Sequence, residues 1–111
     1  MDTIPRLSRS RFSSYVKLTQ KKHRRERGRF IIEGPHLAEE ALASSWTVEA
    51  MLVTEAFASQ PSSAVIFNQA STRKAEVSTV SESEMAQMSE TVTSQGVVCV
   101  VLAKEPAGAK E

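Results

Sequence analysis

The sequence predicts a small α/β protein, a three-layer sandwich in which a mixed or parallel sheet lies between helices. Short β-branched apolar runs alternate along the chain with segments whose apolar residues recur at helical spacing. The runs at 30–32 and 97–103 are apolar throughout, which is typical of strands covered by helices on both faces. At 111 residues the chain fits one domain.

The first predicted element is a helix over about residues 10–25. Phe12, Tyr15 and Val16 recur near helical spacing, and the later part of the segment is rich in Lys and Arg, which suit the C-terminal end of a helix dipole. Gly28 then ends this helix.

The stretch RFIIEGPHLAEEAL, residues 29–42, predicts a strand, a tight turn and a helix. Gly34 allows an unusual backbone conformation, and Pro35 suits the first helical position, where a missing N–H costs nothing. One apolar stripe follows and ends near residues 44–45, and it is formed by Leu37, Ala38, Ala41 and Leu42.

The next elements are less uniform. WTVEAMLVTE, residues 46–55, reads as a second strand with Val48, Met51, Leu52 and Val53 buried, and a polar connection follows it. Residues 62–75 fit a strand at Val65 to Phe67 or a helix with Val65, Ile66, Gln69, Ala70 and Arg73 on one face. Periodicity cannot decide over so short a run, but the composition favours a helix.

The last third of the chain predicts strand, helix, strand and tail. A strand is expected at residues 76–80, and Ser81 and Glu84 form a capping box that starts a helix, with Val80 stapled onto Met85. That helix continues through Met88 and Val92. Gly96 introduces a central strand, and residues 104–111 form a polar tail or linker.

The charge is divided between two parts of the chain. Residues 1–29 carry ten Lys and Arg against two acids, a net +8, while residues 30–111 carry four against eleven, a net −7. Such a division is typical of a protein whose basic part binds a polyanion by releasing counterions from phosphates. The alternative is a solvated or flexible basic tail.

Other classes of protein are disfavoured. Cys99 is the only cysteine, which excludes a disulfide framework and fits a reducing, cytoplasmic location, although the Arg- and Ser-rich start also has the composition of an organellar transit peptide. The longest apolar run, 97–103, is far shorter than the about 20 residues of a membrane span.

Catalytic and metal chemistry find no support in the sequence. The four glycines are scattered and build no phosphate-binding loop, and His23 and His36 have no second ligand at metal spacing. Cys99 lies within an apolar strand and is expected to be inert, and the pair Glu39 and Glu40 reads as a solvated helix face. We therefore expect no catalytic residue and no metal site.

The remaining candidate is an RNA-binding surface formed by the basic helix and the turn at residues 33–36. Helix N-termini at strand ends offer free N–H groups to anions, and the few aromatic residues favour recognition of RNA shape and backbone over base stacking. The turn is expected beside the end of the helix. The candidate RNA-binding residues are Lys17, Lys21, Lys22, Arg24, Arg25, Arg27, Arg29, Glu33, Gly34 and His36.

Two stretches resemble a known family. FIIEGPHLAEEA resembles the F-x-x-E-G-x-x-L-x-x-E-A signature of the N-terminal substrate-binding domain of SpoU (TrmH-type) RNA ribose methyltransferases. VSESEMAQMSETVTSQGVVCVV is similar to that domain's closing pattern, except that Ser94 stands where the family often has proline. The matched positions are Phe30, Glu33, Gly34, Leu37, Glu40, Ala41, Val80, Ser81, Met85, Ser89, Thr91, Thr93, Gln95 and Gly96.

The resemblance implies a fold similar to ribosomal and kink-turn-binding RNA proteins, and a domain over residues 1–103 that holds structured RNA. Ribosomal RNA is favoured over transfer RNA as the target, although the sequence leaves both open. The resemblance also implies that methylation belongs to a following knotted domain, absent from this chain, that binds S-adenosylmethionine and forms a homodimer. Residues 104–111 would begin the linker, and this chain alone would be a monomer without cofactor. A stand-alone ribosomal-protein-like RNA-binding module and a protein-interaction domain are the alternatives.

Overall fold

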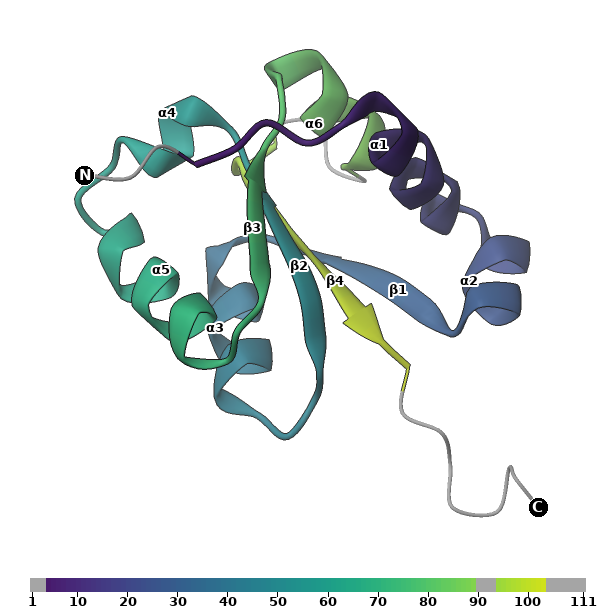
Figure 1. Ribbon diagram of the computed structural model, residues 1–111, viewed down its shortest axis with the longest axis horizontal. Coiled ribbons are helices and arrows are strands. Elements are labelled where there is room, and N and C mark those ends of the chain that lie inside the picture. Colours follow the sequence, from purple (N-terminus) through teal and green to yellow (C-terminus); the bar gives the residue numbers. More distant parts are fainter. Residues whose placement is uncertain (1–3, 90–93, 104–111) are drawn as a thin grey trace.

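The computed structural model describes residues 4–89 and 94–103 and consists of a four-stranded sheet with helices on both faces (Figure 1). The strand order is β1-β4-β2-β3, where β4 runs antiparallel to β1 and β2, and β3 runs parallel to β2. The strands are β1 (Arg29–Glu33), β2 (Val48–Val53), β3 (Glu76–Thr79) and β4 (Val97–Leu102). The predicted three-layer class with a mixed sheet is confirmed.

The helices divide between the two faces of the sheet. They are α1 (Arg9–Val16), the 3-10 helix η1 (Lys17–Thr19), α2 (Lys21–Arg27), α3 (Pro35–Ala43), α4 (Glu55–Ala58), α5 (Ser63–Thr72) and α6 (Glu82–Met88). Residues of α3, α4 and α5 pack on one face, and residues of α1, η1 and α6 pack on the other. Helix α2 contributes no buried residue and lies at one end of the sheet (Figure 1).

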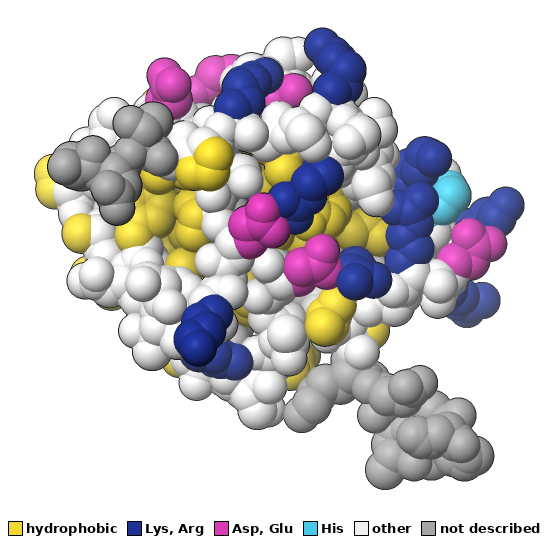
Figure 2. All heavy atoms as spheres, viewed as in Figure 1, with side chains coloured by type: hydrophobic (Ala, Val, Ile, Leu, Met, Phe, Trp, Pro, Cys, Tyr) yellow, Lys and Arg dark blue, Asp and Glu magenta, His cyan; other side chains and the backbone are white. Residues whose placement is uncertain are grey.

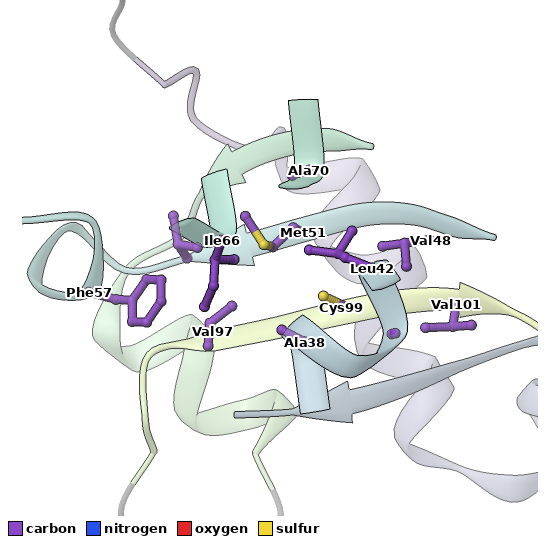
Figure 3. Packing of buried hydrophobic residues seen from close by; sticks show 12 residues of the cluster. Ala38, Leu42, Val48, Met51, Phe57, Ile66, Ala70, Val97, Cys99 and Val101 are labelled. Carbon is purple, nitrogen blue, oxygen red and sulfur yellow. The ribbon is translucent and has the colours of Figure 1, made fainter. Parts of the chain in front are cut away.

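Strand β4 contributes buried side chains to both hydrophobic cores, one on each face of the sheet. Its side chains alternate, so Val97, Cys99 and Val101 face α3 and α5, while Val98 and Val100 face α1 and α6. Figure 3 shows Val97, Cys99 and Val101 lying opposite side chains of the neighbouring helices. Residues 97–101 are fully buried, as expected for the predicted central strand.

Strand β1 was wrongly predicted to be buried on both faces. All five of its residues are only partly buried, because β1 is at the edge of the sheet and has β4 as its neighbour on one side only. Two residues that the helical patterns placed inside are also exposed, Leu37 at 46% and Val65 at 56%. The apolar stripes of α3 and α5 are therefore narrower than predicted.

The single helix predicted over residues 10–25 is broken into α1, η1 and α2. Gln20 has an extended backbone (φ −104°, ψ 133°) between η1 and α2. The tighter η1 turn places Leu18 in the core at 1% exposure, and the Thr19 hydroxyl donates to the carbonyl of Val16 (2.8 Å). Since no apolar residue follows Leu18 in this segment, α2 turns away from the core and presents only polar side chains.

The chain before α1 runs alongside β3. Leu7 N donates to Thr79 O (2.9 Å) and Thr79 N donates to Pro5 O (2.8 Å), so this segment covers the outer edge of β3. Leu7, Phe12 and Tyr15 belong to the second core. The basic N-terminal part of the chain is therefore folded onto the sheet rather than a flexible tail.

The remaining elements largely follow prediction. Residues 63–72 form the favoured helix, and the Ser81–Glu84 capping box opens α6, with Val80 and Met85 in one core cluster. The polar connection after β2 contains an unpredicted short helix, α4, capped by Thr54. Val92 lies outside the described residues. No helix in the described part of the chain is long and apolar enough to cross a membrane.

Candidate nucleic-acid interface

Three predicted site residues, Arg24, Arg27 and Arg29, are held by contacts within the fold. Arg24 Nη1 donates to Leu18 O (3.1 Å), and Arg27 Nη1 donates to the Ser14 carbonyl (2.9 Å) and hydroxyl (2.7 Å). Arg29 Nε is hydrogen-bonded to Glu49, and Arg29 Nη1 donates to Arg27 O (3.0 Å). Arg24 thus joins α2 to η1, and Arg27 joins α2 to α1. Arg29 joins the start of β1 to β2.

The other basic residues of this region point outward, and we call them the α2 cation set: Lys17, Lys21, Lys22 and Arg25. All four side chains are exposed, and none makes an ion pair or side-chain hydrogen bond within residues 4–89 and 94–103. Figure 2 shows Lys and Arg side chains gathered with a histidine at the edge of the molecule that α2 occupies in Figure 1.

The helical period separates these two groups on α2. Arg24 and Arg27 are three residues apart, on one face, and reach toward η1 and α1, whereas Lys21, Lys22 and Arg25 lie on the outer side. Gly28 ends α2 with a left-handed backbone (φ 65°, ψ 35°), and its N–H donates to Arg24 O (3.0 Å). Three of the four outward cations are thus presented by a short helix with a defined end, and Lys17 lies in the preceding η1.

The turn at Gly34 lies at the other end of β1 from α2, so the expectation that it sits beside the basic helix is wrong. A strand rises about 3.3 Å per residue, which separates Arg29 from Glu33 by about 13 Å. Gly34 N donates to Val97 O (2.9 Å), and the Ser89 hydroxyl donates to Glu33. His36 is exposed and pairs with Glu40 (3.0 Å). Gly34, Glu33 and His36 therefore belong to a different region from the α2 cation set.

An open pocket of about 210 Å³ lies between α1 and the α2 end of the sheet, and the sequence did not predict it. Its lining residues are Arg11, Ser14, Tyr15, Leu18, Arg27, Arg29 and Glu49. Tyr15 Oη donates to Glu49 Oε2 (3.0 Å), and Arg11 Nη2 lies 2.7 Å from Tyr15 Oη and also pairs with Glu76. The pocket wall is therefore a connected network of charged and phenolic groups.

Glu49 reaches this pocket because of a bulge in β2. The register with β4 shifts between Val48 and Ala50. In a regular strand these two side chains would lie on the same face, but here Val48 packs in the first core and Ala50 in the second. The signal in the sequence was Glu49 itself, the one charged residue in the otherwise apolar stretch VEAMLV. Its partners Tyr15 and Arg29 come from distant elements, and no sequence pattern joins them.

Protonation states in this region follow from burial and pairing. Burial raises the pKa of Tyr15, so the phenol remains protonated and can donate to Glu49. The hydrogen bonds from Arg11 lower the pKa of Glu76, which keeps that carboxylate charged. In the core, burial raises the pKa of Cys99 to about 12, as expected of an unreactive thiol.

The comparison with protein families decides the assignment. A family model described as the MRM3-like substrate binding domain matches residues 11–99. The chain belongs to this family. The match begins in α1 and ends in β4, so it contains the α2 cation set, the Gly34 turn and every residue of the pocket.

Solved structures share the fold of this MRM3-like domain. An rRNA methyltransferase from Sinorhizobium meliloti has a TM-score of 0.72 and 23% identity over 93% of this chain and 37% of its own. An RNA 2'-O ribose methyltransferase has a TM-score of 0.75 and 23% identity over 94% of this chain and 38% of its own. The SpoU methyltransferase AviRb from Streptomyces viridochromogenes has a TM-score of 0.67 and 18% identity over 86% of this chain and 33% of its own.

The MRM3-like domain thus spans between 33% and 38% of the length of these methyltransferases. A comparison with curated proteins finds no significant match. Within residues 4–89 and 94–103, no group of three or more His, Cys, Asp or Glu side chains is arranged to hold a metal ion.

Proposed function

We propose that this domain holds structured RNA, ribosomal rather than transfer RNA, for a ribose 2'-O-methyltransferase. The observation that carries the proposal is the α2 cation set, four exposed cations without partners in the described part of the chain. Three of them lie on the short helix α2, which like charges destabilise, so folding gives no reason for them. Contact with phosphates does, because each neutralised phosphate releases counterions.

The family and its fold relatives support the enzymatic part of the proposal. The structures of similar fold are named as RNA methyltransferases, and one of them as an rRNA methyltransferase bound to AdoMet. In this proposal residues 1–103 form the RNA-binding domain, residues 104–111 begin a linker, and a following domain binds S-adenosylmethionine and dimerises. The full-length enzyme would act in the cytoplasm.

The test compares two double variants that each remove two exposed positive charges. Lys21→Gln/Lys22→Gln alters the α2 cation set, and Arg9→Gln/Lys74→Asn is the control, with Asn chosen because Lys74 has φ 60° and Asn tolerates that backbone. Affinity for a structured ribosomal RNA fragment is measured at several salt concentrations. Each lost phosphate contact should reduce the salt slope by about 0.7 to 1.

We expect the Lys21/Lys22 variant to bind more weakly, with a slope lower by about 1.4 to 2, and the control to stay closer to wild type. Circular dichroism establishes that both variants remain folded. If the two variants lose the same affinity and slope, the effect is one of net charge, and the α2 cation set is not the RNA contact.

A further inference from the structure

The pocket beside Glu49 has the size of a single small ring system. Its volume is about 210 Å³. A cavity of about 150 Å³ admits benzene, while sites for drug-sized ligands run from about 300 to 1,000 Å³. The occupant that fits is larger than one six-membered ring and smaller than a whole cofactor.

The charged wall of the pocket offers hydrogen-bond donors with no partner in the fold. The hydrogen bonds of Arg27 leave from Nη1, and those of Arg29 leave from Nε and Nη1. Within the described residues, the Nη2 groups of both arginines have no acceptor. Each therefore has two N–H groups available to a ligand.

The same wall offers acceptors. Glu49 Oε2 receives the Tyr15 hydroxyl, and Glu49 Oε1 receives Arg29 Nε. Each carboxylate oxygen has two lone pairs, so each can accept one more hydrogen bond. The side chains of Arg29 and Glu49 are 38% and 29% exposed, which leaves them within reach of a ligand from solvent.

Apolar groups complete the lining. Tyr15 and Leu18 belong to the second core, are only 5% and 1% exposed, and supply the small apolar part of the pocket lining. A nucleobase matches this combination, because its faces are apolar and its edge carries both acceptors and donors. A phosphate matches less well, because it has acceptors only and the Glu49 carboxylate repels it.

Among the bases, guanine fits the arrangement of donors and acceptors. Arginine can donate hydrogen bonds to the N7 and O6 atoms of guanine, and a carboxylate can accept a hydrogen bond from its N2 amino group. We propose that this pocket receives one unstacked guanine base of the bound RNA, with Arg27 and Arg29 donating to its acceptors and Glu49 accepting from its N–H groups.

This inference rests on the proposed RNA-binding function and adds base recognition to it. Arg27 in the pocket wall and Lys21, Lys22 and Arg25 of the α2 cation set lie on the same seven-residue helix, which is only about 10 Å long, so one RNA segment is long enough to reach both. Phosphate contacts position a nucleic acid but carry no sequence information, whereas contacts to base edges specify it. The pocket supplies the second kind of contact.

The test uses nucleosides, which carry no phosphate. The 111-residue chain is titrated with guanosine, adenosine, cytidine and uridine, and separately with inorganic phosphate and ribose 5-phosphate, while amide NMR shifts are followed. We expect guanosine to give saturable shifts at Ser14, Leu18 and Glu49, and to bind at least about fivefold more tightly than the other nucleosides.

Two variants sharpen the result, and the amide spectrum of each reports whether it is folded. Glu49→Gln keeps the side-chain shape but loses the carboxylate, and Arg27→Gln removes the guanidinium, so each should weaken guanosine binding roughly tenfold. The control Glu39→Gln removes one exposed charge from α3 and should change nothing.

Pocket shifts caused by phosphate or ribose 5-phosphate but not by guanosine would overturn the proposal in favour of an anion site. So would equal binding of all four nucleosides, or no saturable shift with any of them. Since nucleosides do not engage the polyanion surface, the outcome is independent of the Lys21/Lys22 salt titration. Failure of the guanine pocket and failure of the RNA-binding function are therefore distinguishable.

Discussion

Gly34 adopts a backbone conformation, φ 102° and ψ 152°, that is essentially confined to glycine. It lets β1 end and α3 begin within one residue, with Pro35 at the first helical position. A Cβ at Gly34 would lie 3.0 Å from Gln95 Oε1, the end of a flexible exposed side chain, so the cost of a substitution is mainly backbone strain.

We predict that Gly34→Ala destabilises the domain by about 1 to 3 kcal/mol, which lowers the melting temperature by about 4–8 °C per kcal/mol in a domain of this size class. Gly28→Asn is the matched control, since Gly28 has an ordinary left-handed backbone with open space around it and Asn tolerates that region. Differential scanning calorimetry of both variants is the measurement. Equal melting temperatures would mean that the turn relaxes without strain.

Gly34 and Glu49 show which site residues a sequence can reveal. The requirement at Gly34 is local, because the turn residues Gly34 and Pro35 stand next to each other between a strand and a helix pattern. The environment of Glu49 depends on a bulge and on side chains from α1 and β1. Neither contact is encoded near Glu49, so its place in a pocket became evident only from the structure.

Helix α2 has seven residues and no buried side chain, so neither its length nor a hydrophobic face stabilises it. The inward hydrogen bonds of Arg24 and Arg27 are what join it to η1 and α1. We predict that Arg27→Ala destabilises α2 by about 1.5 to 3 kcal/mol, the usual contribution of hydrogen bonds to a charged group.

The measurement for α2 is amide hydrogen exchange, which reports local opening. Exchange of the α2 amides should accelerate in Arg27→Ala while β4 amides remain protected. Arg25→Ala is the control, because Arg25 is exposed on the same helix and makes no ion pair or side-chain hydrogen bond in the described region. Equal acceleration in the two variants would show that Arg27 does not anchor the helix.

At the scale of elements, the sequence correctly predicted the helices and strands that are marked by a strong local sequence pattern. The capping box of α6 and the apolar run of β4 were found where expected. The break at Gln20 was missed because the flanking residues Lys17 to Arg27 are mostly good helix formers, and the break depends on Leu18 reaching the core. Within α2, a run of basic residues also cannot distinguish Arg24, which donates to Leu18 O, from the exposed Arg25.

The topology of the whole molecule brings the end of the last strand beside α2. Strand β4 is antiparallel to β1, so Leu102 pairs with Arg29, and Ala103 N donates to Gly28 O (2.8 Å). A linker that begins at residue 104 would therefore leave the domain beside α2. RNA held on the α2 cation set would lie near the start of this proposed linker.

If RNA binding resides in this domain and cofactor binding in a following one, the isolated chain should bind structured RNA as a monomer but should not bind S-adenosylmethionine. The cofactor is of drug-like size, and the pocket of about 210 Å³ is too small to bury it, since such ligands need about 300 Å³ or more. Isothermal titration calorimetry of the 111-residue chain with S-adenosylmethionine should show no saturable heat, while the same preparation binds a ribosomal RNA fragment and sediments as a monomer. The RNA titration is the control for a competent, folded sample.

Saturable binding of S-adenosylmethionine at micromolar concentration would place part of the cofactor site in this domain. That result would contradict the proposal that RNA recognition and methylation reside in separate domains.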